Sequence, residues 1–183
     1  PLLLIFGGGW ALKEMFDRKA HNKRVSRITE MSEAEKPEGT VQDVQLLLGF
    51  LEGGKHNSEE YEIMAASVLS KLQGDGVDDA ICRGVATAQG DGRINLIRAI
   101  GMREYADGVP YMLEELNNPR KETHLSTWNT LGFISRSSDV PLLIDALDAI
   151  DTGDDKDDDR EREFAKEAII SVCERVAGEE QRT

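Results

Sequence analysis

The chain has 183 residues, of which 39% are hydrophobic and 31% charged, and its formal net charge is −13. This length is enough for one domain with a sizeable core. The charge is uneven, because residues 1–30 hold six basic and three acidic residues and the remainder holds sixteen basic and thirty-two acidic. The acidic body excludes nucleic acid and anionic lipid as its partners, since binding to phosphates needs a basic face. It favours a basic protein partner, or serves solubility alone.

Two cysteines, Cys82 and Cys173, fall at or near buried positions of predicted helices. Two thiols in a chain of this length do not make a disulfide framework. We therefore expect a reducing compartment, in which both cysteines act as small hydrophobic residues.

The chain begins with an apolar run, residues 1–12, and six basic residues follow from Lys13 to Arg27. The run is shorter than the roughly 20 residues that span a bilayer. Two interpretations stay open: the end of a membrane span with Trp10 at the interface, or a soluble capping helix that packs on the body. Membrane association would thus involve residues 1–27. Three successive glycines, Gly7–Gly9, disfavour one straight helix by roughly 1 kcal/mol each.

A polar helix is predicted over residues 11–35, and Lys36-Pro37-Glu-Gly39 then breaks the chain. Residues 1–36 are therefore expected to form an N-terminal segment. The body begins at Thr40, where Thr40–Asp43 resembles a capping box. Apolar residues at helical spacing and Gly- or Pro-containing turns then alternate to about residue 177, and a polar tail covers residues 178–183. Ser58 and Asp91 are expected to cap two of these helices, and Gly178 to end the last one.

The predicted helices repeat in pairs. The first helices of the pairs align on Val44, Val77, Val109 and Val140, at steps of 33, 32 and 31 residues. The second helices align on Leu69, Ile100, Leu131 and Cys173, at steps of 31, 31 and 42 residues. The last step is longer than the others, and its additional residues fall at Asp151–Asp159, which we expect to be an acidic loop at one edge of the helix stack. A period in the thirties made of two helices is typical of an α-solenoid, in which each pair buries its apolar sides on its neighbours.

Two dipeptides recur in the same order, first as Ile100-Gly101 and Val109-Pro110 and then as Leu131-Gly132 and Val140-Pro141. These recurrences resemble HEAT repeats. They are most similar to the short HEAT-like repeats of phycobilin-lyase-type proteins, over residues 40–177. The resemblance implies an all-α fold, an α-α superhelix of about four helix pairs with an N-terminal helix. It also implies a concave, protein-binding face lined by the second helices, with enzymatic activity the exception.

The residues show no catalytic, cofactor or metal site. The three histidines, His21, His56 and His124, lack metal-ligand spacing, and the sequence has no HExxH, CxxC, P-loop or GxSxG motif. The acidic run Asp151–Asp159 is read as a solvated loop, with docking of a basic segment and Ca²⁺ binding as alternatives. Its spacing does not fit an EF-hand.

The sequence thus favours a non-catalytic scaffold or adaptor for a protein partner, with Trp128 as a core anchor. The expected contact residues lie on exposed sides of the second helices: Asn95, Arg98, Asn129 and Phe133. We expect a cytoplasmic location, at the cytoplasmic face of a membrane if the chain is an accessory subunit of a membrane-associated complex. The rival hypothesis is a lyase- or chaperone-like protein that handles a prosthetic group such as a tetrapyrrole, which needs a cysteine beside a histidine.

Overall fold

The structure is a computed structural model that describes residues 2–52, 58–119, 121–150 and 156–180. The side chains of residues 2–13 and 179–180 lie outside this description. The predicted interfacial position of Trp10 therefore falls outside it, as do His56 and Asp151–Asp155.

The described residues form nine α-helices and three short 3-10 turns, which confirms the all-α fold. The helices are α1 (Leu2–Glu33), α2 (Val41–Leu51), α3 (Glu59–Lys71), α4 (Val77–Thr87), α5 (Gly90–Met102), α6 (Val109–Leu116), α7 (His124–Ile134), α8 (Val140–Asp148) and α9 (Lys156–Glu180). The only β-type pairing within these ranges is one isolated bridge between Glu38 and Gln73.

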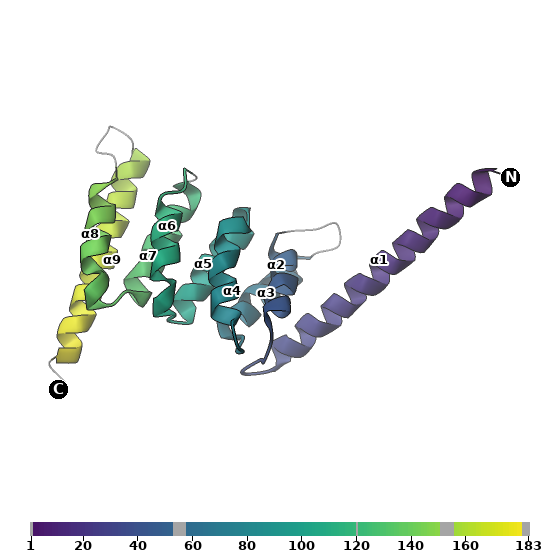
Figure 1. Cartoon of the computed structure of the whole chain (residues 1–183), viewed down its shortest axis with the longest axis horizontal. Coiled ribbons are helices and arrows are strands. Elements are labelled where there is room, and N and C mark those ends of the chain that lie inside the picture. The colour runs from purple at the N-terminus through teal and green to yellow at the C-terminus, as the bar shows by residue number, and fades with distance from the viewer. Residues whose placement is uncertain (1, 53–57, 120, 151–155, 181–183) are drawn as a thin grey trace.

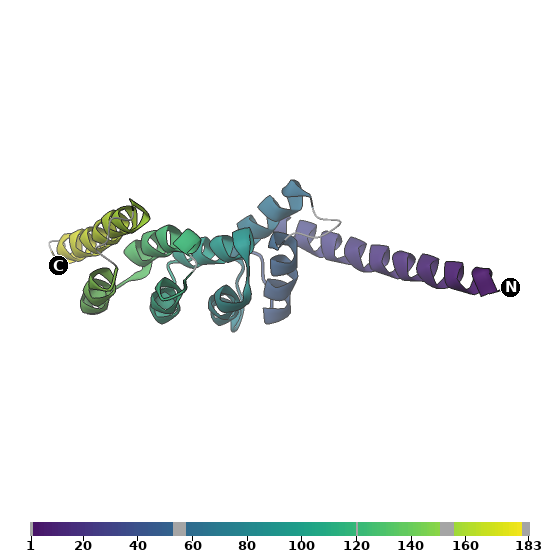
Figure 2. The ribbon, with the colours of Figure 1, turned by 90° about the horizontal axis from the view of Figure 1, so that it is seen from above.

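The eight helices after α1 pack as neighbouring pairs in two layers (Figures 1 and 2). In one layer α2 contacts α4, α4 contacts α6, and α6 contacts α8. In the second layer α3 contacts α5, α5 contacts α7, and α7 contacts α9. The two ends of the chain lie at opposite ends of the row, and α1 extends away from it (Figure 1). This is the predicted pairing of helices in chain order.

One hydrophobic core runs along the row between the two layers. Trp128 of α7 is fully buried in it, which confirms its predicted role as a core anchor. The predicted alignment positions Val44, Val77 and Val109 are buried too. Burial of each such side chain contributes about 1.5–3 kcal/mol.

Several predicted helix ends were wrong. Helix α1 continues through Gly7–Gly9, because a glycine weakens a helix without forbidding it. Helix α9 begins at Lys156, so Asp157–Asp159 form its first turn and not a loop; negative charge is favoured there by the helix dipole. It also continues past Gly178 to Glu180. Asp91 lies inside α5 and does not cap it. Ser58 does stand at the predicted N-cap position of α3, but its side chain forms no capping bond.

None of the described helices is long and apolar enough to cross a membrane. The C-terminal half of α1 packs against α3 and buries Ile28 and Met31.

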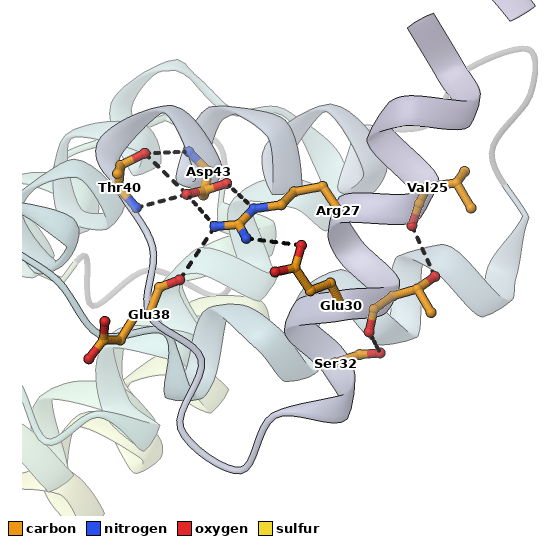
Figure 3. Close-up of polar contacts among 8 residues, drawn as sticks. Val25, Arg27, Glu30, Ser32, Glu38, Thr40 and Asp43 are labelled. Atoms are coloured by element: carbon orange, nitrogen blue, oxygen red, sulfur yellow. Dashed lines mark hydrogen bonds and ion pairs between the residues drawn. The ribbon is translucent and has the colours of Figure 1, made fainter. Parts of the chain in front are cut away.

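A polar network joins α1 to the first pair (Figure 3). Asp43 and Thr40 form the predicted capping box at the start of α2. Arg27 of α1 donates from Nε to Asp43 Oδ1 at 2.9 Å and pairs with Glu30 at 3.2 Å. The bond from Arg27, aided by bonds from Thr40, holds the pKa of Asp43 below its usual range. The Asp43 carboxylate therefore caps α2 and also accepts a hydrogen bond from α1.

Glycines let consecutive second-layer helices approach closely. A Cβ added to Gly101 of α5 would lie 3.2 Å from Thr130 Oγ1 of α7, and one added to Gly132 would lie 3.2 Å from the Cα of Ala168 in α9. These are the glycines of the repeated Ile-Gly and Leu-Gly phrases. Thr130 also donates to the carbonyl of Ile97 at 3.0 Å. The repeated phrase therefore sets the spacing of the second layer.

Cationic side chains cap the carbonyl ends of preceding helices. Lys71 of α3 donates to the Ala34 carbonyl just after α1 at 3.0 Å. Arg103, just after α5, donates to the Leu69 carbonyl of α3 at 3.0 Å. Arg175 of α9 donates to the Gly132 and Phe133 carbonyls of α7 at 2.9 Å. The Leu69, Gly132 and Phe133 carbonyls lie in the last turns of their helices, which leave them open, and every one of these bonds places positive charge near the negative end of a helix dipole.

Replacing Gly132 by valine should destabilise the protein by about 2 kcal/mol or more, because the added carbons meet the backbone of α9. Gly178→Val is the matched control, since a Cβ at Gly178 meets nothing within 4 Å. That variant should stay within about 0.5 kcal/mol of the parent. Urea denaturation followed by circular dichroism measures both. Equal losses would show that the close approach of α7 and α9 is not responsible.

Asp43→Asn should cost about 1–2 kcal/mol at pH 7, because it removes the charged acceptor of Arg27. The pKa of Asp43 is lower in the folded state than its ordinary 3.8, so this stabilisation is present above pH 3.8 and is lost as the pH falls through the depressed folded value. The difference in unfolding free energy from the parent should shrink between pH 7 and pH 3. Asp75→Asn, in an exposed turn, should show no such difference. A difference that is the same at both pH values would contradict the charge pair as its source.

Candidate functional site

The second layer exposes a regular array of side chains. Positions 31 residues apart on α3, α5 and α7 form three columns on the outer side of that layer. The columns are Ile63, Ile94 and Leu125; Ser67, Arg98 and Asn129; and Lys71, Met102 and Phe133. We call this array the second-layer face. Within each helix the three members are four residues apart, so they lie on one side of it.

The expected contact residues lie on or beside the second-layer face. Arg98, Asn129 and Phe133 are exposed and belong to its columns, whereas Asn95 is half-buried beside them. Asn95 and Arg98 also line a groove of about 270 Å³ between α3 and α5. Asn129 and Phe133 lie one helix further along, outside this groove. The four residues thus share one side of the layer but not one pocket.

Large apolar side chains stand out on every second-layer helix. Ile63 of α3 is 63% exposed, Met102 of α5 71%, Phe133 of α7 60% and Ile170 of α9 54%. Of these, sequence reasoning named only Phe133. The repeat register could have found Met102, which lies 31 residues before Phe133, and Ile63, which lies 31 before Ile94. The sequence gives no such indication for Ile170, because the step from α7 to α9 does not follow the 31-residue repeat.

The groove between α3 and α5 is mainly acidic. Glu59, Glu62 and Asp91 line it, opposed by one cation, Arg98, and Ile63 forms part of its apolar wall. Exposed apolar groups rimmed by charge are typical of protein-binding surfaces. The excess of carboxylates favours a basic partner.

The two cysteines lie in different environments. Cys82 of α4 is buried, and burial together with Asp78 and Asp79 raises the pKa of its thiol to about 12. It stays protonated at neutral pH, which makes it a poor nucleophile. Cys173 is exposed on α9, which corrects its expected position at or near the core.

The described histidines are held in structural contacts. His21 of α1 lies against the rings of Phe50 and Tyr61, at centroid distances of 6.4 and 6.3 Å. His124 is buried at the start of α7, with Nδ1 2.9 Å from Glu161 Oε1 and Nε2 2.9 Å from the Asn118 carbonyl. Both ring nitrogens are therefore occupied. Glu161 lies twelve residues before Cys173, about 18 Å along α9, so His124 and that thiol are far apart.

The His124–Glu161 contact requires a shared proton. The Asn118 carbonyl can only accept, so Nε2 carries a proton. A second proton must lie between Nδ1 and the carboxylate for that contact to be a hydrogen bond. Trp128 Nε1 also donates to Glu161 Oε1, at 3.3 Å. Sequence reasoning missed this cluster, because Glu161 stands in a run of charged residues that reads as solvated.

The acidic segment is only partly described. Asp151–Asp155 lie outside the described residues, whereas Asp158 in α9 is buried and paired with Lys121. Across the described part of the chain, no group of three or more histidine, cysteine or acidic residues is placed to hold a metal ion.

Cys173 should react with a thiol reagent much faster than Cys82, because only Cys173 is exposed. Titration of the native protein with 5,5′-dithiobis(2-nitrobenzoate) at pH 7.5 should release one fast equivalent, and a second should follow in denaturant. Cys173→Ser should remove the fast phase, and Cys82→Ser should keep it. Rapid reaction of both thiols in the native state would contradict the burial of Cys82.

No protein-family model, curated protein or solved structure matches this chain.

Proposed function

We propose that the chain is a HEAT-like α-solenoid scaffold that binds a basic protein partner through the second-layer face and has no catalytic activity. The observation that carries this proposal is the array itself. Positions 31 residues apart line one side of three successive helices, and each second-layer helix exposes one large apolar side chain; two of these, Met102 and Phe133, share a column. Scattered apolar side chains are common on protein surfaces, but exposed apolar side chains gathered on one face are typical of an interaction surface.

The layered packing supports the solenoid part of the proposal. Each pair contacts its neighbours along the row, the C-terminal part of α1 packs against α3, and the chain ends lie at opposite ends (Figure 1). Such a row presents an extended surface that a partner can follow across several helices. A stable complex buries about 800 Å² on each partner, which needs more than one groove.

The state of the thiols and histidines supports a non-catalytic role over the handling of a prosthetic group. Cys82 is held protonated, and both ring nitrogens of His124 are engaged. The cysteine–histidine pair on which the rival hypothesis depends does not form with either of these groups.

Replacing two exposed apolar residues of the second-layer face should weaken partner binding. We expect Met102→Ser with Phe133→Ser to raise the Kd of the partner by at least about tenfold, since a buried anchor residue contributes more than 1 kcal/mol. The matched control is Phe16→Ser with Ile144→Ser, two exposed apolar residues outside this face. The partner is captured from the source cells with the parent protein as bait, then purified and titrated against each variant by calorimetry. A partner that binds both double variants equally would contradict the face.

A further inference from the structure

The other layer carries a second, different opening. A cavity of about 510 Å³ lies between the third and fourth helix pairs, within the size range of ligand sites. Its walls come from α6, α8 and the first turns of α7 and α9. Leu113, Leu142 and Ala146 provide apolar walls, and the fully buried Trp128 also lines it.

The repeat gives this cavity a counterpart. The preceding junction, between α4 and α6, has a smaller groove of about 400 Å³, and each of its lining residues except Asn117 lies 31 positions before a residue that lines the cavity. Cys82 corresponds to Leu113, Tyr111 to Leu142, and Glu114 to Asp145. Glu115, however, corresponds to Ala146.

That difference removes a buried polar contact from the later junction. Glu115 is buried, where it accepts from Arg93 at 3.2 Å and from Thr123 at 2.7 Å. One repeat later the corresponding side chains are Ala146 and His124, which are shorter than glutamate and arginine. Glu161 reaches His124 from α9, and Ala146 and Trp128 both stand around the cavity, Trp128 without exposed surface of its own.

The charges around the cavity select the kind of group that it would hold. Three carboxylates line it, Asp145, Asp158 and Glu161, against two basic side chains. Lys121 pairs with Asp158, and His124 pairs with Glu161. Asp145 is exposed at the opening and takes part in none of the ion pairs among the described residues. An anionic group would meet this carboxylate, whereas a cation on an apolar stem would satisfy it and also cover the apolar walls.

We propose that this cavity binds a lysine side chain of a protein partner, with the alkyl stem against Leu113, Leu142 and Ala146 and the ammonium at Asp145. The inference rests on the proposed function only in taking a protein partner as the molecule that supplies the lysine. It adds a second contact, on the opposite layer from the second-layer face. A lysine flanked by apolar residues is the segment that fits, because the wall of the cavity is mostly apolar.

Trp128 provides a direct readout. In a Trp10→Phe background it is the only tryptophan, so its emission reports on the cavity. The peptide N-acetyl-Leu-Lys-Leu-amide should shift this emission saturably, and N-acetyl-Leu-Glu-Leu-amide should bind at least about tenfold more weakly. Equal responses to the two peptides, or no saturable response to the lysine peptide, would overturn the proposal. Because this titration needs no natural partner, its failure leaves the test of the second-layer face unaffected.

Matched variants locate the contact. Asp145→Lys should abolish the response, whereas Asp148→Lys should preserve it, since Asp148 is exposed on the same helix but does not line the cavity. Ala146→Leu should narrow the cavity and weaken binding, with an unchanged circular dichroism spectrum. Equal effects of the two aspartate variants would overturn the assignment. Saturable binding of hexylammonium without binding of the lysine peptide would show a site for free amines and overturn the protein source.

Discussion

The close approach of consecutive second-layer helices is the contact on which the rest of this molecule depends. Gly101 against Thr130 and Gly132 against Ala168 are contacts in which an added Cβ would lie 3.2 Å from the neighbouring helix, so a larger side chain would require a shift. This close approach places equivalent residues of α5 and α7 beside one another, and those of α3 continue the same columns. It also brings Arg175 within reach of the end of α7. A wider spacing would separate the columns and leave those carbonyls without a donor.

Polar contacts at the junctions between helix pairs also fix the register in which the helices pack. Apolar surfaces can slide over one another, but a buried ion pair tolerates little displacement, because breaking it costs about 3–5 kcal/mol. Arg93 and Glu115 form such a pair, and the carbonyls of Ala88 and Ala86 accept from Nε and Nη2 of the guanidinium. His124 and Glu161 form its counterpart one repeat later, with the carboxylate supplied by the second layer instead of the first. The two junctions therefore use different polar contacts, and the later one has the larger opening, about 510 Å³ against about 400 Å³.

The two proposed surfaces suit one kind of partner. The groove on the second-layer face and the cavity in the first layer both combine apolar walls with an excess of carboxylates. A basic segment with interspersed apolar residues would be favoured at each of them. The acidic body would also attract such a segment from a distance, over roughly 8–10 Å at physiological salt.

The sequence by itself determined the helices, their pairing and the side of each that is buried, because these follow from the spacing of apolar residues and from local turn chemistry. The capping box at Thr40 and Asp43, the buried Trp128 and the exposed Arg98, Asn129 and Phe133 were all predictable in this way. The ends of α1 and α9 were not, because glycine and aspartate carry only weak preferences that neighbouring helical turns override. Only the tertiary structure decided that Glu161 meets His124, that Asp158 meets Lys121, and that Ala146 leaves a cavity. These are contacts between helices far apart in the chain, and their geometry depends on the distance between the packed helices, which no local pattern of residues encodes.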